Sequence, residues 1–168
     1  TLCSVCIAKG NEVIALQENN EGNQHASLLT PFIEQVLKDA GLTMQQLDAV
    51  SLSAGPGSYT GLRIGASAAK AICYAAGKPL ITVNTLQAMV AGYIKTHGHP
   101  EPNTVFCPMI DARRMEVYAA LYNTKLEEIK ATQPWILCGR FLPAAIQFPL
   151  AHTCTINRNR LTVPILLQ

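Results

Sequence analysis

The chain has 168 residues, of which 49% are apolar, and its formal net charge is only +2. This length and apolar content support one domain or two small lobes with a buried core. The near-neutral balance predicts neither nucleic-acid binding nor a membrane surface from bulk charge, and no apolar run reaches the roughly 20 residues that span a bilayer.

The pattern of strand and helix formers predicts an α/β protein. In chain order we expect a hairpin over 2–17, a helix over 25–40, a strand over 49–53, a helix over 61–76, a strand over 80–83, a helix over 85–94 that Thr85 caps, and strands over 105–110 and 117–121. Pro31 inside the first helix marks a kink or a late start. Strands with helices between them, after one initial hairpin, predict a mixed sheet flanked by helices.

Two of the six cysteines form a CxxC in the first predicted strand, at Cys3 and Cys6. Residues three apart on a strand face opposite sides of the sheet, and no second pair stands at zinc-finger spacing. We therefore expect buried free thiols, no metal or redox site, and a cytoplasmic protein.

The composition changes after Gln133. All 11 acidic residues lie in residues 1–133, whereas residues 134–168 contain none. We expect an N-terminal lobe over 1–100 and a partial second lobe over 101–168, in which 134–168 is atypical and receives no assigned chemistry.

The stretch SAGPGSYTGLRIG at residues 53–65 places a glycine-rich turn between a strand and a helix. Gly55 and Gly57 flank Pro56, so the turn can be sharp, and Ser58 offers a hydroxyl. With a helix N-terminus behind it, such a turn suits an anion. The Gly-Lys-Ser/Thr ending of a P-loop is absent, however, and GxGxxG is not matched cleanly. The residues leave two readings open, a phosphate-binding loop or a tight turn packed on a helix.

Small residues dominate the helix over 61–76, and Gly61, Gly65, Ala68 and Ile72 share one of its faces. Small side chains let another helix approach closely. This helix therefore needs a close neighbour, which is either the first helix of the chain or a partner subunit.

Three stretches, in this order, resemble the TsaB (YeaZ) family of tRNA threonylcarbamoyladenosine biosynthesis proteins, formerly grouped with glycoproteases of the peptidase M22 type. They are HASLLTPFI at 25–33, SAGPGSYTGLRIG at 53–65 and MIDARRMEVY at 109–118. The resemblance covers about residues 1–133. It implies the actin-like (ASKHA, ribonuclease H-like) fold, with a complete N-terminal lobe and a partial second lobe.

The resemblance also implies a function. Family members are non-catalytic scaffolds that pair with the catalytic paralogue TsaD, with the ATPase TsaE joining, for threonylcarbamoyl transfer to adenosine 37 of tRNAs that read codons beginning with A. It implies no activity for the chain alone, a homodimer in the absence of TsaD, contact with tRNA only through the complex, and no membrane. No cofactor is implied, and weak binding of ATP or ADP is left open.

Site residues follow from the same resemblance, and none of them is catalytic or metal-binding. The phosphate-loop-like turn comprises Gly55, Gly57, Ser58 and Gly61. The partner interface on the first two helices comprises His25, Leu29, Phe32, Ile33, Leu62, Gly65, Ala69 and Ile72.

Asp111, Arg113 and Glu116 have two readings, a catalytic carboxylate group or a structural turn. No nucleophile or second acid stands at a telling spacing, so we expect a turn locked by an Asp111–Arg113 ion pair. Arg113 and Arg114 are a weak candidate for tRNA contact, because no aromatic residues alternate with them.

His97 and His99 are expected to be solvated loop residues, since a metal site needs further ligands. Two functional alternatives remain. One is an ATP-binding actin-like enzyme that uses the glycine loop, and the remote one is a metalloprotease.

Overall fold

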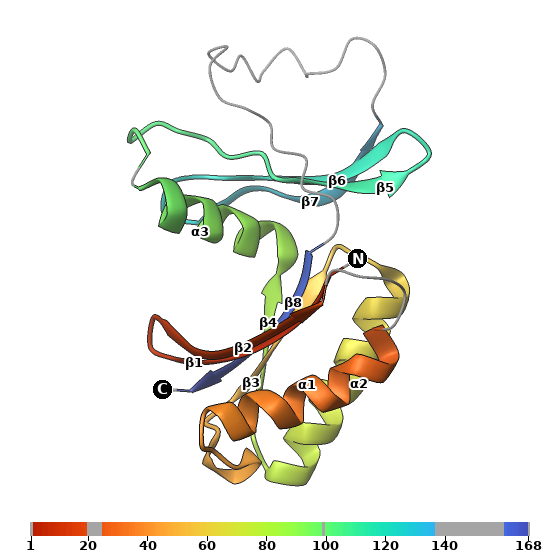
Figure 1. Cartoon of the computed structure of the whole chain (residues 1–168). Helices are drawn as coiled ribbons and strands as arrows, with labels where there is room; N and C mark the ends of the chain where they lie inside the picture. The colour runs from red at the N-terminus through yellow and green to blue at the C-terminus, as the bar shows by residue number, and fades with distance from the viewer. Residues whose placement is uncertain (1, 20–24, 99, 137–159, 168) are drawn as a thin grey trace. The chain divides into compact units, whose positions relative to one another are not determined.

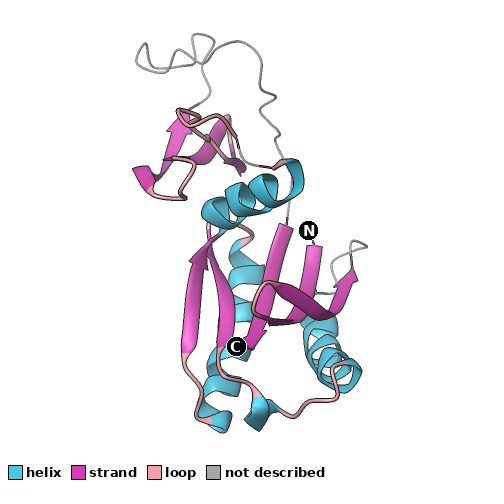
Figure 2. Cartoon of the chain, turned by 90° about the vertical axis from the view of Figure 1, so that its left-hand side faces the viewer, coloured by secondary structure: helices cyan, strands magenta, loops and turns pink. Residues whose placement is uncertain are grey.

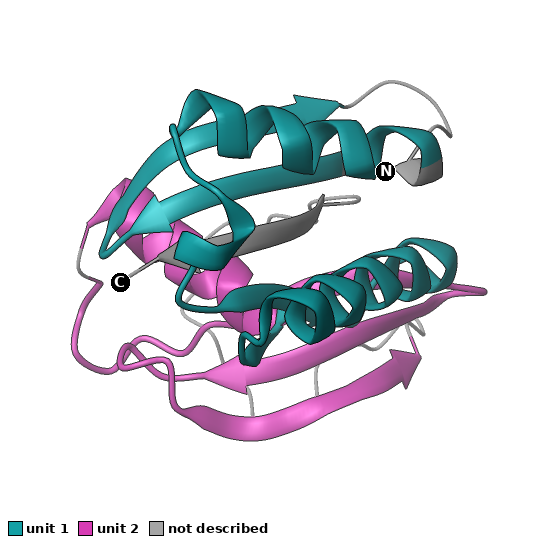
Figure 3. Cartoon of the chain, turned by 90° about the horizontal axis from the view of Figure 1, so that it is seen from below, with its two compact units in different colours: residues 1–85, 159–168 teal, residues 86–158 magenta. Residues whose placement is uncertain are grey.

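The computed structural model describes residues 2–19, 25–98, 100–136 and 160–167. The chain divides into two compact units, one of residues 1–85 with 159–168 and one of residues 86–158 (Figure 3). The division falls at residue 85 rather than at the predicted residue 100, because helix α3 (Thr85–His97) packs on the sheet of the second unit. The fold is mixed α/β, with parallel and antiparallel strand pairs.

The first unit contains a three-stranded and a two-stranded sheet. Its strands are β1 (Leu2–Lys9), β2 (Glu12–Asn19), β3 (Val50–Gly55), β4 (Leu80–Asn84) and β8 (Arg160–Leu167). β1 pairs antiparallel with β2, as the hairpin prediction requires, and β3 pairs parallel with β4. Side chains alternate across β1, so Cys3, Val5 and Ile7 enter the helix-side core while Cys6 faces the other way.

Two helices lie on one side of these strands, α1 (His25–Asp39) and α2 (Tyr59–Ala76) (Figures 1 and 2). α1 begins at His25 and continues through Pro31, so a late start is wrong. The short 3₁₀ helix η1 (Met44–Gln46) follows. The core of this unit joins α1, β1, β2 and Leu47, with α2 packed beside it. Each fully buried Leu, Ile or Val there contributes about 1.5–3 kcal/mol.

The second unit is an antiparallel sheet, in the order β5 (Met109–Arg113), β6 (Glu116–Tyr122) and β7 (Glu128–Ile136). Ala120 and Tyr122 of β6 face α3, and Val117, Ala119 and Leu121 are buried on the opposite face. The central strand is therefore apolar on both sides. β7 was not predicted from the sequence. Trp135 is its only buried residue and its pairing with β6 is irregular, so its residues show no regular apolar alternation.

The C-terminal residues take part in both units. Residues 134–136 end β7, and β8 pairs in parallel with β1 from Leu2 opposite Arg160 to Lys9 opposite Leu167. The rest of the predicted atypical tail, residues 137–159, lies outside the described residues. No strand was predicted at β8, although its sequence RLTVPILL contains the β-branched residues Thr162, Val163 and Ile165. Across the described ranges, no helix is long and apolar enough to cross a membrane.

Candidate functional site

The glycine loop connects β3 to α2, and Gly55 fixes its shape. Gly55 has a φ of 106°, a conformation that residues with a Cβ rarely adopt, and the following peptide bond to Pro56 is cis. A Cβ built on Gly55 would lie 3.2 Å from Cδ1 of Leu62. Glycine adopts this backbone angle without the strain that a Cβ brings, and a Cβ here would also press on the Leu62 side chain.

The N-terminus of α2 is capped by the loop itself. The Ser58 hydroxyl accepts a hydrogen bond from the backbone N–H of Gly61 at 3.3 Å, and the Ser58 carbonyl accepts one from the N–H of Leu62 at 2.8 Å. Ser58 is therefore the N-cap, and the helix begins two residues before the predicted Gly61. The Gly61 N–H is one of the donors with which a helix N-terminus holds an anion, whereas the Leu62 bond is the first regular hydrogen bond of the helix. Because the Ser58 hydroxyl occupies the Gly61 donor, the helix is capped from within the loop.

The predicted interface residues pack mostly inside the first unit. Leu29 and Ile33 of α1 are buried against β1, and Gly65 and Ala69 of α2 are buried as well. Phe32 and Ile72 are half-buried against the same core. Leu62 is half-buried beside Gly55, and the side chain of His25 lies outside the described part of the chain.

The close neighbour that the small residues of α2 require is present within the unit. Ala69 packs against Val50 and Leu52 of β3. Ile64 and Ala68 pack against the core that α1 and β1 share. Of the two neighbours that the sequence left open, α1 is therefore in contact with α2, together with a strand.

The solvent face of α2 carries a different set of residues, which we call the outer stripe. Its members recur at helical spacing and are all exposed: Tyr59, Arg63, Ser67, Lys70 and Tyr74. The side chains of Tyr59 and Tyr74 are 74% and 93% exposed, and the Arg63 guanidinium carbon lies 5.4 Å from the centroid of the Tyr59 ring. This stripe was not predicted, because the expectation for this helix was based on its small residues. The helical spacing of the two tyrosines and the two basic residues is the sequence signal that could have identified it.

Two hydroxyls join the end of β3 to the start of α3. Ser53 Oγ lies 2.6 Å from Thr85 Oγ1, and both residues are buried. Thr85 was predicted to be the N-cap of the helix, whereas the structure places it as the first helical residue, with its hydroxyl on Ser53. The contact satisfies two buried polar groups.

The turn between β5 and β6 is held by a main-chain contact. An Asp111 carboxylate oxygen accepts a hydrogen bond from the backbone N–H of Arg113 at 2.8 Å. The predicted ion pair between these two side chains is therefore wrong, because the carboxylate is bound to the backbone instead. Glu116 stands opposite Arg113 in the strand register. Arg113, Arg114 and Met115 all have left-handed backbones, with φ of 69°, 53° and 62°.

The remaining candidate ligands lie apart from one another. Cys3 and Cys6 are both buried, as expected, and burial raises the pKa of the Cys3 thiol, so it stays protonated. His97 is exposed and stacks on Tyr93 with 4.2 Å between ring centroids, and His99 lies outside the described residues. Within the described ranges, no three His, Cys, Asp or Glu side chains are close enough to hold a metal ion.

Comparison with protein families gives a match over residues 14–142. The matching family is described as TsaD, tRNA N6-adenosine threonylcarbamoyltransferase. The matched range contains the glycine loop, both helices of the first unit and the whole of the described second sheet.

Among curated proteins, the chain is 34% identical to the tRNA threonylcarbamoyladenosine biosynthesis protein TsaB of Haemophilus influenzae, over 69% of this chain and 47% of that protein. It is 30% identical to TsaB of Bacillus subtilis, over 77% of this chain and 55% of that protein. The chain thus spans about half the length of these relatives. Among solved structures, YeaZ from Pseudomonas aeruginosa superposes with a TM-score of 0.62 at 23% identity, over 80% of this chain and 67% of that one, which shows a shared fold.

Proposed function

The chain belongs to the TsaB (YeaZ) family, and from this premise we propose that it acts in the biosynthesis of threonylcarbamoyladenosine in tRNA. The observation that carries the proposal is the similarity to two proteins named for this pathway, over 69% and 77% of this chain. The proposed role is that of a non-catalytic scaffold in the cytoplasm.

The proposed partners follow from the family. The chain pairs with a TsaD-type transferase, TsaE joins them, and the tRNA is modified within this complex. In the absence of TsaD the chain forms a homodimer. The proposed fold is actin-like, in which the strand–glycine loop–helix of β3 and α2 corresponds to a phosphate-binding element. The self-capping of Ser58 supports a structural use of this loop in place of a nucleotide-dependent one.

We place the partner contact on the outer faces of α1 and α2. The burial of Leu29, Ile33, Gly65 and Ala69 supports a role for these residues in holding the two helices together. The exposed surface of α2 includes the outer stripe, which combines two exposed tyrosines with Arg63 and Lys70. Tyrosine and arginine are the side chains that most often dominate binding energy in protein interfaces.

The test is assembly with a TsaD-type protein from the same genome, followed by light scattering. The parent chain should convert from a homodimer to a one-to-one heterodimer. Tyr74→Asp should weaken that complex by tenfold or more, because it places a charge on a side chain that is 93% exposed in the free chain. The fold should be unaffected for the same reason.

Ile129→Asp is the matched control, since it introduces the same charge at an exposed apolar position on β7 of the second unit. It should leave assembly unchanged. If Tyr74→Asp assembles as well as the parent chain does, the partner contact does not lie on the outer stripe of α2. A parent chain that ignores TsaD altogether would contradict the scaffold role itself.

The ATP-binding alternative has its own measurement. Calorimetry with Mg-ATP should show weak binding or none in the parent chain, because the capping hydroxyl of Ser58 already occupies a helix-terminal donor. Micromolar affinity would favour an ATP-dependent enzyme over the scaffold.

A further inference from the structure

Helix α3 covers only part of one face of the second sheet. Ile110, Ala120 and Tyr122 are buried in the cluster that α3 completes. Two residues before Ala120 on β6, Tyr118 lies on the same face and is 37% exposed. Figure 1 shows α3 under one end of the sheet, with the β5–β6 hairpin extending beyond it at the other end.

The uncovered part of this face is a block of four residues, which we call the open half-face. Strand register pairs Tyr118 with Pro134 and Glu116 with Ile136, so all four side chains project to the same side. Ile136 is 60% exposed and Pro134 is exposed as well. Tyr118 thus offers an aromatic ring on a rigid strand with apolar side chains beside it.

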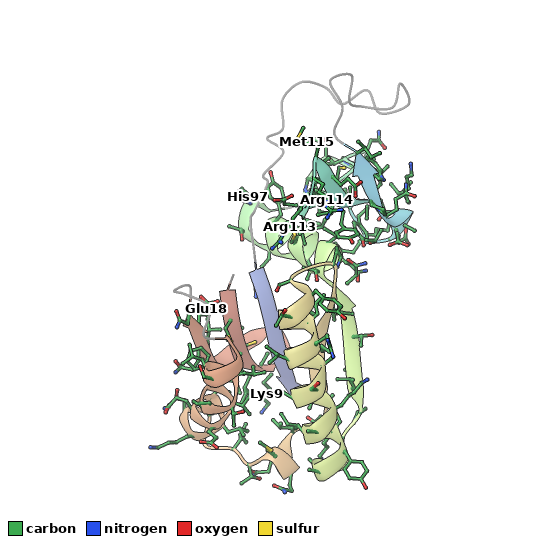
Figure 4. The ribbon with its side chains drawn as sticks, turned by 90° about the vertical axis from the view of Figure 1, so that its right-hand side faces the viewer. Lys9, Glu18, His97, Arg113, Arg114 and Met115 are labelled. Atoms are coloured by element: carbon green, nitrogen blue, oxygen red, sulfur yellow. The ribbon has the colours of Figure 1, made fainter. Side chains whose placement is uncertain are left out.

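The hairpin tip next to this face carries Arg113, Arg114 and Met115 in consecutive left-handed conformations (Figure 4). Each such conformation costs about 1–2 kcal/mol for a residue with a Cβ. All three side chains are exposed, and that of Met115 is 69% exposed. Strained backbone of this kind clusters at functional sites.

Both guanidinium groups at the tip are available. Within the described residues, neither Arg113 nor Arg114 forms an ion pair. Asp111 is bound to the backbone of Arg113, which leaves Glu116, half-buried opposite Arg113, as the carboxylate nearest in the register. Two free guanidinium groups beside an exposed ring supply the phosphate and base contacts of single-stranded RNA recognition.

We propose that the open half-face and the hairpin tip bind a single-stranded RNA segment, with a base stacked on Tyr118 and phosphates bound by Arg113 and Arg114. The choice of RNA over a protein ligand rests on the proposed function in tRNA modification. In the strand register Arg113 stands opposite Glu116, and Tyr118 lies two residues further along β6 on the same face as Glu116. The hairpin therefore holds this aromatic residue at a neighbouring position to the arginines.

The test uses the full chain and a fluorescent, short single-stranded RNA of mixed sequence, followed by anisotropy over a range of salt concentrations. Arg113→Asn with Arg114→Asn removes both charges, and asparagine tolerates the left-handed backbone. It should lower the slope of log K against log salt by about 1.4, because each phosphate contact on a single strand contributes about 0.7. Tyr118→Leu should weaken binding roughly five- to 150-fold, and Tyr118→Phe should preserve it, because stacking needs only the ring.

Lys125→Asn is the matched control, since Lys125 is an exposed cation in the turn at the opposite end of β6. It should bind RNA like the parent. Parental binding by the double arginine variant and by Tyr118→Leu would overturn the proposal, as would an absence of RNA binding by the parent at low salt. If Tyr118→Leu weakens assembly with TsaD and leaves RNA binding unchanged, the face is a protein contact and the RNA proposal fails while the scaffold role stands. RNA binding that requires Tyr118, in a chain that ignores TsaD, would support the RNA site and contradict the scaffold role.

Discussion

The glycine loop of the first unit and the β5–β6 hairpin of the second both contain backbone with positive φ, and they use it in opposite ways. The loop places glycine at its most unusual position and uses the Ser58 hydroxyl to cap its own helix. The hairpin places three residues with side chains in left-handed conformations and leaves two guanidinium groups unpaired within the described residues. The glycine loop therefore uses its hydroxyl within the fold, whereas the hairpin presents its two guanidinium groups to solvent.

Removal of a core side chain from each unit should show the largest effects. Leu47 and Leu86 are both fully buried, one in each unit. Leu47→Ala and Leu86→Ala should each lower the free energy of unfolding by about 2–5 kcal/mol. Hydrogen exchange should show that Leu47→Ala releases the amides of β1 and Leu86→Ala those of β6. If either variant releases both sets equally, the units unfold as one and the two regions share their stability.

Gly55→Ala should be the most damaging change within the glycine loop. It combines a φ of 106° with a Cβ 3.2 Å from Leu62, and the strained backbone alone costs about 1–3 kcal/mol. Gly92→Ala in α3 is the control, because it is helical and a Cβ there would meet nothing within 4 Å. It should stabilise the chain by about 0.5–1 kcal/mol. Thermal unfolding that moves in the same direction for both variants would contradict the special role of Gly55.

The capping role of Ser58 is tested by Ser58→Ala. Loss of an N-cap hydroxyl should lower the free energy of unfolding by about 1 kcal/mol. Ser58→Asp keeps an acceptor for the Gly61 amide and should retain most of the stability. Denaturant unfolding of the three proteins measures the difference, and an unchanged Ser58→Ala variant would show that the hydroxyl does not stabilise α2.

A change of similar size, confined to the turn, is expected in the hairpin. Asp111→Ala removes the acceptor for the Arg113 amide and should cost about 1 kcal/mol, whereas Asp111→Asn keeps an oxygen in place. Heteronuclear NMR of residues 111–116 should show loss of the ordered turn in the alanine variant only. Equal order in both variants would show that the strand pairing alone holds the turn.

The smallest effect at neutral pH concerns Tyr122. Burial is the main cause that raises the pKa of this phenol in the folded chain, with Glu128 adding to it. The neutral phenol is therefore favoured by folding, and its contribution to stability is complete below the usual tyrosine pKa near 10. That contribution is lost as pH rises through the higher folded pKa. Tyr122→Phe should flatten the fall in stability above about pH 10, as measured by unfolding at fixed temperature. A fall of the same size in both proteins would assign it to other groups.

Local patterns in the sequence determined most of the elements. The hairpin of β1 and β2, the helices α1 and α2 and the strand before the glycine loop lie within a few residues of their predictions. Their apolar spacing, the left-handed Gly77 after α2 and the turn at Gly10 are local signals. The same reading identified the loop, its helix and the two buried thiols.

Contacts between distant segments decided the rest. No local signal places Arg160 opposite Leu2, or Trp135 on the far side of β6 from α3, because strand pairing joins residues far apart in the chain. The sequence also left open which neighbour the small-residue face of α2 contacts, since small residues suit a neighbour within the chain and a partner subunit equally well. In the folded chain Ala69 of α2 is buried against β3, and Tyr59 and Tyr74 are exposed on the outside. Sequence periodicity fixes which residues share a face, whereas only the tertiary contacts fix what that face meets.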